Sequence, residues 1–321
     1  MNKYYFSHGR SALLNGMKLL NISKNDFILI PDYLCEIVEI TLKSLNLKII
    51  KYEINDDFTI NIKNLELKLK FKKVKAVLFV NYFGFPQKID KLKKLCKKYK
   101  VKIIEDNSHG HGGSINNKIL GTRGNFGFSS PRKVFKINSG GMLYCKDKVT
   151  FNLPKYKYNI NNTLINVINK NFKLKTFIKK NLLFKKDFTI PTTKRDNIVY
   201  NTIIDNLSLK KIKKENINEE KNKRYINYII WKKYLTKNKL QPIFKKINKN
   251  LMIWCLPFYV KNSNEAKKWF LWGHKKGITI FSWPDLSIDN IKKNNKCFKR
   301  WKRLVCLPID MPNSFLKKLC N

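Results

Sequence analysis

The chain has 321 residues, enough for one large domain or two of about 150 residues each. Hydrophobic residues make up 43% of the chain, which excludes a chain that is disordered throughout. Its 67 Lys and Arg outnumber 22 Asp and Glu, and the formal net charge is +45. Such a balance usually indicates a polyanionic partner. The lysines are spread along the chain, however, and accompany an excess of Asn, Ile, Phe and Tyr, all residues with A/T-rich codons. We attribute the charge to this bias and expect no nucleic-acid partner.

The seven cysteines form no CxxC pair, and most lie in apolar runs. We interpret them as reduced, buried thiols of a cytoplasmic protein. The first residues, MNKYYFSHGR, contain no apolar signal core. The longest uncharged apolar stretch, about residues 76–87, is shorter than the ~20 residues that a membrane span needs. We therefore expect a soluble protein without a membrane span.

Apolar runs of strand length alternate with segments of helical spacing in the first half of the chain. In chain order these are a helix at 11–20, a strand at 27–30, a helix at 36–45, strands at 47–52 and 77–82, a helix at 89–100, and strands at 101–105 and 141–145. Continuous apolar strands separated by helices are typical of a parallel sheet with helices on both faces.

The pattern weakens beyond residue 150. A long helix is predicted at about 215–235. Strand candidates follow at 251–256, 278–281 and 304–307, with helical patterns between them. This arrangement indicates a smaller α+β domain. We expect a large domain over residues 1–210, then a linking helix and a small C-terminal domain over residues 211–321.

The residues most suited to chemistry are concentrated between positions 105 and 141. The segment IIEDNSHGHGG places Asp106, His109 and His111 at the carboxyl end of a predicted strand. Ligands bind at that end in parallel α/β sheets. Taken alone, the segment is compatible with a metal site, with cofactor recognition or with a polar loop that has no chemistry. The metal site has the least support, because no third strong ligand follows at a useful spacing.

The next segment is GTRGNFGFSSPRKVFKINSGGMLY. Gly127, Ser129 and Ser130 predict a turn whose hydroxyl and backbone N–H groups could hold a phosphate. Lys133 follows closely, and a Gly-Gly pair then leads into a strand. A single lysine is weak evidence for a functional site in so lysine-rich a chain. The order of strand-end acid, hydroxyl-rich turn, lysine and paired glycines is more specific evidence.

Four stretches in this order resemble the DegT/DnrJ/EryC1/StrS family of pyridoxal-phosphate-dependent sugar aminotransferases. They are GRSALLNGMKLL, ILIPDYLCEIVEITL, the stretch from VNYFGFPQ to IIEDNSHGHGG, and the stretch from GTRGNFGFSSPRK to SGGMLY. The resemblance covers most of residues 6–146, with a looser match at SWPDL and RLVCLPID. It implies an α/β protein of the aspartate-aminotransferase fold (fold type I). It also implies a homodimer that moves an amino group from glutamate to a nucleotide-linked keto sugar, for surface polysaccharide or related amino-sugar biosynthesis.

The resemblance also assigns roles to individual residues. Lys133 matches the lysine that forms a Schiff base with pyridoxal 5'-phosphate, whereas Lys136 lacks the PRK spacing. Asp106 matches the acid that keeps the pyridine nitrogen protonated. His109 stands where the family most often has the Gln that binds the phenolic oxygen of the cofactor. His111 matches a position that we interpret as structural.

The remaining expected contacts surround the phosphate and the ring of the cofactor. Backbone N–H groups near Arg10 and Ser11, at a helix start, would bind the phosphate, and Ser129 or Ser130 would add a hydroxyl. Tyr33 would supply the stacking surface that many members carry as an aromatic residue at the position of Cys35. The family's phosphate-binding Asn from the partner subunit has Asn201 as its candidate here. No metal is expected.

Several features depart from the family. The segment from serine to lysine is about two residues shorter, and the region 151–210 is compressed. Asn125 replaces the usual Asp, and Asn81 stands where His is frequent. Three alternatives therefore stay open: a non-catalytic homologue, a sugar dehydratase of the same family, and a basic nucleic-acid-binding protein. Lys133 argues against the dehydratase, because known dehydratases of the family carry His in its place.

Overall fold

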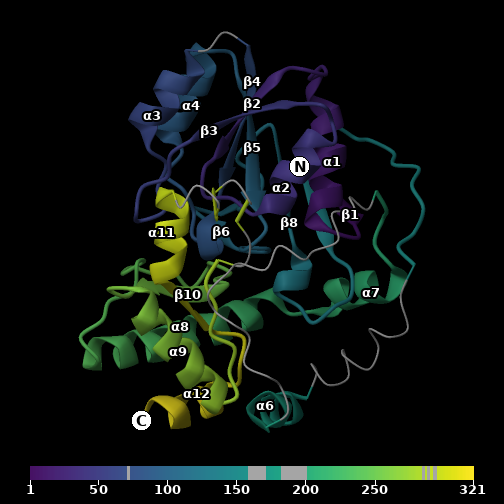
Figure 1. Ribbon diagram of the computed structural model, residues 1–321. Coiled ribbons are helices and arrows are strands. Elements are labelled where there is room, and N and C mark those ends of the chain that lie inside the picture. Colours follow the sequence, from purple (N-terminus) through teal and green to yellow (C-terminus); the bar gives the residue numbers. More distant parts are fainter. Residues whose placement is uncertain (71–72, 158–170, 182–200, 284–285, 288–289, 292–294) are drawn as a thin grey trace. The chain divides into compact units, whose positions relative to one another are not determined.

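The computed structural model describes the chain except for residues 71–72, 158–170, 182–200, 284–285, 288–289 and 292–294 (Figure 1). The chain divides into two compact units. The first contains residues 1–157 and 196–215, and the second contains residues 158–195 and 216–321. Most of the compressed middle region and part of the SWPDL match lie outside the described residues.

Within the described residues, the first unit contains a seven-stranded sheet in the order β1-β9-β8-β5-β4-β2-β3. Its strands are β1 (Asn2–Phe6), β2 (Phe27–Pro31), β3 (Lys48–Tyr52), β4 (Val74–Val80), β5 (Lys102–Asn107), β8 (Phe126–Ser129) and β9 (Gly141–Cys145). β9 pairs antiparallel with β1 and β8, and the other neighbouring strands pair in parallel. The predicted, mostly parallel α/β sheet is confirmed.

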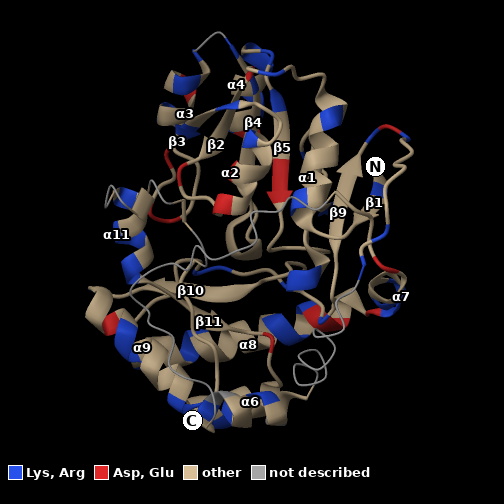
Figure 2. Ribbon diagram, turned by 45° about the vertical axis from the view of Figure 1, so that its right-hand side comes forward, with Lys and Arg blue, Asp and Glu red and all other residues tan. Residues whose placement is uncertain are grey.

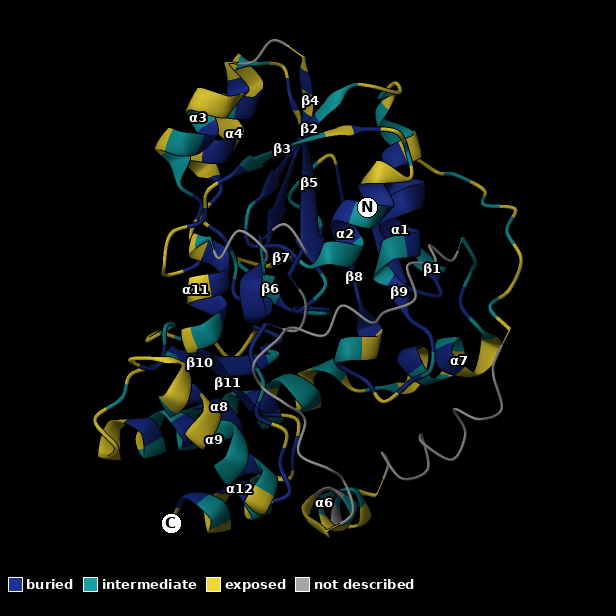
Figure 3. Ribbon diagram, viewed as in Figure 1, coloured by how far each residue is buried: buried dark blue, intermediate teal, exposed yellow. Residues whose placement is uncertain are grey.

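Two pairs of helices cover this sheet. α1 (Gly9–Met17) contacts α2 (Glu36–Lys43), and α3 (Ile62–Leu69) contacts α4 (Asp90–Lys98). The right-handed crossovers between parallel strands place the two pairs on opposite faces, as Figure 1 shows. α4 buries Leu92 and Cys96 and turns its lysines to solvent. In Figure 3 the central strands of the sheet are mostly dark, the edge strands β1 and β3 are mostly intermediate, and the helices carry exposed outer faces, so the core lies along the middle of the sheet.

Smaller elements of the first unit lie at the ends of its strands. The 3-10 turn η2 (Tyr82–Gly84) follows β4, and η3 (Pro131–Lys133) follows β8. The short hairpin of β6 (Ser114–Ile115) and β7 (Lys118–Ile119) lies between β5 and β8. α7 (Asn206–Lys214) closes the unit.

The turn predicted around Gly127 and Ser129 is wrong, because both residues lie in β8. A Cβ atom on Gly127 would come within 2.2 Å of the Gly121 carbonyl oxygen and 2.8 Å of the Glu105 carbonyl oxygen. This glycine therefore marks a close approach of the β8 backbone to β5 and to the loop that precedes β8. The chain turns only after β8, at Ser130 and η3.

The second unit combines helices with a two-stranded antiparallel sheet. Its elements are α6 (Phe172–Asn181), α8 (Ile217–Lys237), β10 (Cys255–Tyr259), α9 (Ser263–Lys275), α11 (Lys296–Arg303), β11 (Leu304–Pro308) and α12 (Asn313–Cys320). The predicted long helix and the last strand are confirmed by α8 and β11. Trp231 of α8 is fully buried, and its indole N–H donates to the carbonyl oxygen of Pro308 at 2.8 Å.

Two strand predictions in the second unit need correction. β10 begins only at Cys255, and Phe281 makes an isolated bridge to Cys306 without a strand around it. Leu251, Met252 and Ile253 are buried. The apolar runs therefore indicate burial, which a loop inside a small core can also provide.

Lysine and arginine occur on helices of both units (Figure 2). Within the described residues, no helix combines the length and the apolar character needed to cross a bilayer.

Candidate functional site

Asp106 lies at the carboxyl end of β5, in the middle of the sheet. Its side chain is buried, and the backbone N–H of Ser108 donates to its Oδ1 at 2.8 Å. The Ser108 side chain forms a further hydrogen bond to this carboxylate. Burial raises the pKa of Asp106, while the hydrogen bonds from Ser108 and the charge of Lys133 act to lower it. Asp106 is thus an oriented carboxylate in a poorly hydrated place.

Lys133 is the last residue of η3 and is half-buried. Its backbone N–H donates to the carbonyl oxygen of Ser130 at 2.9 Å, which fixes the turn. The positive charge of its side chain acts to lower the pKa values of both Asp106 and His109. The fold therefore brings together an amine, an acid and a histidine that lie up to 27 positions apart in the sequence.

His109 is buried next to η2. The backbone N–H of Phe83 donates to its Nδ1 at 3.1 Å, and the two rings stack at 6.1 Å and 27°. Burial lowers the pKa of His109 well below its usual range, and the charge of Lys133 adds to this effect. A ring nitrogen that accepts a hydrogen bond carries no proton, so the neutral imidazole carries its proton on Nε2. The sequence leaves this charge state open, and the structure defines it.

The N-terminus of α1 lies beside these groups. A Cβ atom built on Gly9 would lie 3.5 Å from Ser108 Oγ and 3.7 Å from both the Ser129 carbonyl oxygen and Ser130 Cβ. The N-cap residue His8 makes no side-chain capping bond to the helix. The backbone N–H groups of the first turn and the helix dipole both favour an anion at this end.

The predicted hydroxyl groups differ in how they are used. Ser11 Oγ lies 3.2 Å from Ser7 Oγ, inside a buried network. Ser129 Oγ lies 2.9 Å from His111 Nδ1 and 3.3 Å from the Tyr144 hydroxyl. Its side chain is therefore used in hydrogen bonds within the first unit. Ser130 Oγ makes a long contact of 3.4 Å to the Gly140 carbonyl oxygen. Of the two alternatives, Ser130 is the better candidate for a phosphate.

Two arginines, Arg10 and Arg132, act electrostatically on His8 at the start of α1. Burial, followed by the charges of Arg132 and Arg10, lowers the pKa of His8 to about 3. Both guanidinium groups therefore lie within electrostatic reach of the His8 ring. Arg10 was predicted for its backbone N–H only, and Arg132, which lies in the same PRK triplet as Lys133, was not predicted.

Tyr33 lies inside an aromatic cluster. Its ring is fully buried and contacts the rings of Phe58 at 5.4 Å and Tyr82 at 6.4 Å. Phe83 joins the cluster through Phe58 at 5.0 Å. Tyr33 thus supports the side of the site that holds His109.

Cys35 and Asn201 were the other two positions considered for cofactor contacts. Cys35 is the N-cap residue of α2. Asn201 Oδ1 accepts a hydrogen bond from Asn15 of α1 at 2.8 Å within the same chain.

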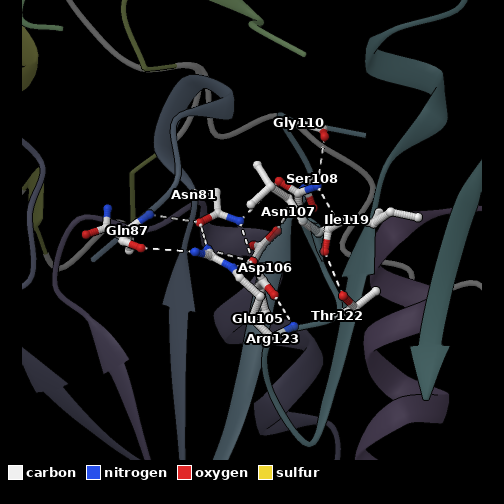
Figure 4. Close-up of polar contacts among 11 residues, drawn as sticks. Asn81, Gln87, Glu105, Asp106, Asn107, Ser108, Gly110, Ile119, Thr122 and Arg123 are labelled. Carbon is white, nitrogen blue, oxygen red and sulfur yellow. Dashed lines mark hydrogen bonds and ion pairs between the residues drawn. The ribbon is translucent and has the colours of Figure 1, made fainter. Parts of the chain in front are cut away.

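A polar network that the sequence analysis missed lies behind Asp106 (Figure 4). Successive side chains of β5 point to opposite faces, so Glu105 faces away from the Asp106 side chain. Glu105 is fully buried and pairs with Arg123 at 2.7 Å. The Asn81 amide donates to Glu105 Oε1 at 2.8 Å and accepts from Arg123 at 2.8 Å. An acid in an apolar strand needs such a partner, and that signal could have been read from IIED.

Among the described residues, no group of three or more His, Cys, Asp or Glu side chains could hold a metal ion.

Comparisons with known proteins indicate one family of aminotransferases. Residues 5–155 match the model of the DegT/DnrJ/EryC1/StrS aminotransferase family. A dTDP-3-amino-3,6-dideoxy-alpha-D-galactopyranose transaminase of Aneurinibacillus thermoaerophilus is 26% identical over 147 residues, which are 44% of this chain and 40% of that protein. A GDP-perosamine synthase of Escherichia coli O157:H7 is 25% identical over 149 residues, covering 45% of this chain and 40% of that protein. The matched stretch thus spans about two-fifths of the length of these curated relatives.

Solved structures resemble the whole chain. PseC of Helicobacter pylori, an aminotransferase involved in the biosynthesis of pseudoaminic acid, superposes with a TM-score of 0.73 at 19% identity, over 100% of this chain and 85% of that one. The putative sugar aminotransferase Spr1654 of Streptococcus pneumoniae, in its PLP-form, gives 0.70 at 14% identity, over 99% and 85%. These likenesses confirm the expected fold type I architecture.

Proposed function

We propose that this chain, whose residues 5–155 match the DegT/DnrJ/EryC1/StrS aminotransferase family, is a pyridoxal-phosphate-dependent aminotransferase that acts on a nucleotide-linked keto sugar. The observation that carries the proposal is that the charge of Lys133 acts on both Asp106 and His109 at the carboxyl end of β5. The printed names of the curated relatives, a dTDP-aminosugar transaminase and a GDP-perosamine synthase, support this substrate class. Glutamate is the proposed amino donor.

The residues present fit this cofactor. Asp106 is a carboxylate whose pKa is raised by burial, and a protonated pyridine nitrogen would supply an opposite charge that offsets its desolvation. The start of α1, with Ser130 beside Gly9, offers N–H and hydroxyl donors to a phosphate. The charges of Arg10 and Arg132 favour a dianion at the same place.

Each side chain then has a defined task. When bound, the cofactor supplies an electron sink that makes the Cα proton of the amino donor acidic. Lys133 Nζ would hold the cofactor covalently and, once the amino donor displaces it, would move that proton from Cα to C4′ of the cofactor. Asp106 keeps the ring nitrogen protonated, and Ser108 holds Asp106 in place. His109 donates from Nε2 to the ring oxygen.

The test is covalent labelling. Purified protein is incubated with pyridoxal phosphate, reduced with borohydride, digested and examined by mass spectrometry. We expect the label on Lys133, and Lys133→Ala should lose both the label and the visible absorbance. Lys136→Ala is the matched control and should keep both. A wild-type chain that takes up no label would contradict the proposal, as would a label on Lys136.

The substrate assignment has its own test. This test follows the visible absorbance of the bound cofactor. The cofactor-loaded protein is mixed with glutamate and a panel of keto sugar nucleotides. We expect the visible band to fall with glutamate and to return with one of the sugars. A band that no amino donor changes would favour the non-catalytic homologue.

The proposal also covers the domain organisation, the oligomeric state and the cellular compartment of the enzyme. We assign cofactor binding to a large domain over residues 1–210, with a linking helix and small domain over residues 211–321. We assign the active form to a cytoplasmic homodimer with its sites at the interface. Light scattering of the purified protein tests the dimer, and salt-dependent titration with DNA tests the expectation that no nucleic acid is bound.

A further inference from the structure

The hydrogen bond at His109 determines which of its nitrogens is protonated. The donor is a backbone N–H, that of Phe83, so His109 Nδ1 can only be the acceptor. The ring is consequently neutral, and its proton lies on Nε2. A glutamine in this position would always offer an N–H donor. A histidine offers one permanently only when its tautomer is held.

The backbone that supplies this N–H adopts an unfavourable conformation. Phe83 has φ 55° and ψ 15°, in the left-handed region that a bulky residue rarely adopts. A residue with a side chain adopts this conformation only at an energetic cost. The turn persists only where neighbouring contacts hold it, so the residues that hold the turn also hold the tautomer of His109.

Asn81 holds the start of the turn. Its backbone N–H donates to the Asp106 carbonyl oxygen at 2.9 Å, and its carbonyl oxygen accepts from Gly84 at 3.2 Å. Its side-chain amide donates to Glu105 Oε1 at 2.8 Å and to Asn107 Oδ1 at 3.2 Å. Asn81 therefore connects the turn to β5, the strand that carries Asp106.

Arg123 ties together both ends of the segment that contains the turn. One guanidinium nitrogen donates to Asn81 Oδ1 at 2.8 Å, and another donates to the Gln87 carbonyl oxygen at 3.0 Å. The backbone N–H of Gln87 also donates to Asn81 Oδ1, at 3.2 Å. The charge of Arg123 is balanced by Glu105, so the planar guanidinium group is held in a fixed orientation (Figure 4).

We propose that Asn81 and Arg123 are positioning residues that hold the Phe83 amide against His109 Nδ1, so that His109 permanently presents an Nε2–H donor to the ring oxygen of the cofactor. The role toward the ring oxygen rests on the proposed function. The tautomer itself does not, because it is a property of the protein without cofactor.

Nitrogen NMR of the protein labelled with 15N-histidine, without cofactor, tests the tautomer directly. The chain has four histidines, and loss of one signal set in His109→Gln assigns His109. We expect an unprotonated Nδ1 and a protonated Nε2 in the wild type at neutral pH. An imidazolium ring, or a ring protonated at Nδ1, would overturn the proposal.

Arg123→Lys tests the positioning role. Lysine keeps the charge opposite Glu105, but its single ammonium group cannot reproduce the planar fork that joins Asn81 and Gln87. We expect a mixture of tautomers at His109, while the signals of His8, His111 and His274 stay in place. The matched control is Arg303→Lys, because Arg303 also donates through its guanidinium group to a backbone carbonyl oxygen, that of Val260 at 3.0 Å. This control should leave His109 unchanged.

Asn81→Ser is the second variant, for the case in which Arg123→Lys does not fold. It leaves the Glu105–Arg123 pair in place and removes the amide, and it should produce the same mixture at His109. A single, unchanged tautomer in a folded positioning variant would overturn the proposal.

Cofactor binding gives an independent readout. Weakening one neutral hydrogen bond to the ring oxygen should lower the affinity for pyridoxal phosphate by up to about tenfold in Arg123→Lys and not in Arg303→Lys. If the wild type binds no cofactor while the tautomer is as expected, the proposed function fails and the positioning role stands. Equal affinity in Arg123→Lys and the wild type would overturn the link to the ring oxygen.

Discussion

Asp106 is a side chain whose burial lowers the stability of the folded protein at neutral pH. Burial raises its pKa in the folded protein above the unfolded value. A carboxyl group shifted in this direction contributes stability that is present below the unfolded pKa and is lost as pH rises through the folded pKa. At neutral pH the protein without cofactor therefore carries an unfavourable charge that a bound cation would offset.

Asp106→Asn should separate the two effects. We expect the melting temperature of the cofactor-free protein to rise at neutral pH, because the buried charge is gone. Affinity for pyridoxal phosphate should fall on the order of 100-fold or more, because a buried cation without its partner costs about 3–5 kcal/mol. Thermal denaturation and cofactor titration measure the two quantities. Asp56→Asn, at an exposed position, is the control and should change neither.

The sequence could indicate only those residues of the candidate site that carry a chemical signature. The family resemblance assigned roles to Lys133, Asp106 and His109, and in the structure the charge of Lys133 acts on both Asp106 and His109. Phe83 and Ser108 were missed because they act through backbone N–H groups, which every residue type except proline carries. Their roles depend on long-range geometry that residue identity does not encode.

At the scale of elements, the site depends on how closely β9 approaches the start of α1. A Cβ atom on Gly141, the first residue of β9, would lie 2.0 Å from the His8 carbonyl oxygen and 2.7 Å from the Gly9 nitrogen. The neighbouring Gly140 N–H donates to the Ser7 carbonyl oxygen at 2.6 Å. Backbone is therefore in direct contact with backbone, and no side-chain rotation could relieve a substitution.

Gly141→Ala should push the start of α1 away from the sheet. We expect the free energy of unfolding to fall by roughly 3 kcal/mol, at the upper end of the usual overpacking range. Urea denaturation followed by circular dichroism measures this change. A variant as stable as the wild type would show that this approach is looser than the geometry indicates.

Gly9→Ala should behave differently, although Gly9 lies next to the same strand. Its new methyl group would meet Ser108 and Ser130 only at ordinary contact distances of 3.5 and 3.7 Å. Replacing a helical glycine reduces the entropy of the unfolded chain, so stability should be kept or rise by about 0.5 kcal/mol. Affinity for pyridoxal phosphate should nevertheless fall, because the methyl group occupies space beside the proposed phosphate donors. Unchanged affinity would move the phosphate away from α1.

Helices and strands were predictable where the periodicity of apolar residues agrees with the glycines and prolines that mark the ends of elements. The alternation of apolar strands with helices gave the parallel sheet, and the Gly-Gly pair marked the start of β9. β8 was mistaken for a turn because its glycine and serine are also turn residues, and only the neighbouring strands show that Gly127 is there for close packing. The runs at 251–254 and 278–281 pack in the core without forming strands, which periodicity alone cannot distinguish.

At the scale of the whole molecule, buried neutral histidines make the fold sensitive to acid. Burial lowers the pKa values of His8 and His111 to about 3, and that of His109 well below its usual range. The unfolded chain takes up these protons near pH 6.5, and the folded chain does not. Stability is therefore lost as pH falls from about 6.5 towards 3, by about 1.4 kcal/mol per pH unit for each histidine. The raised pKa of Asp106 opposes this trend.

Urea denaturation at a series of pH values between 4 and 6.5 measures this slope. We expect about 4 kcal/mol per pH unit from the three histidines, less the opposing contribution of Asp106. His111→Asn should remove about a third of the histidine contribution, whatever its effect on stability at pH 7. An unaltered slope in this variant would show that His111 becomes protonated in the folded protein.

The first unit is closed by a segment that returns from far along the chain. Residues 202–204 exchange backbone hydrogen bonds with Tyr5 and Ser7 near the amino terminus and with residues 154–156, and the Thr202 hydroxyl donates to Ser7 Oγ at 2.7 Å. The stretch between residues 157 and 196 is thus bracketed by two anchored ends on one scaffold. Both ends of that stretch are fixed by hydrogen bonds that do not involve its own residues. A change of chain length between residues 157 and 196 would therefore leave these bonds, and the closure of the first unit, in place.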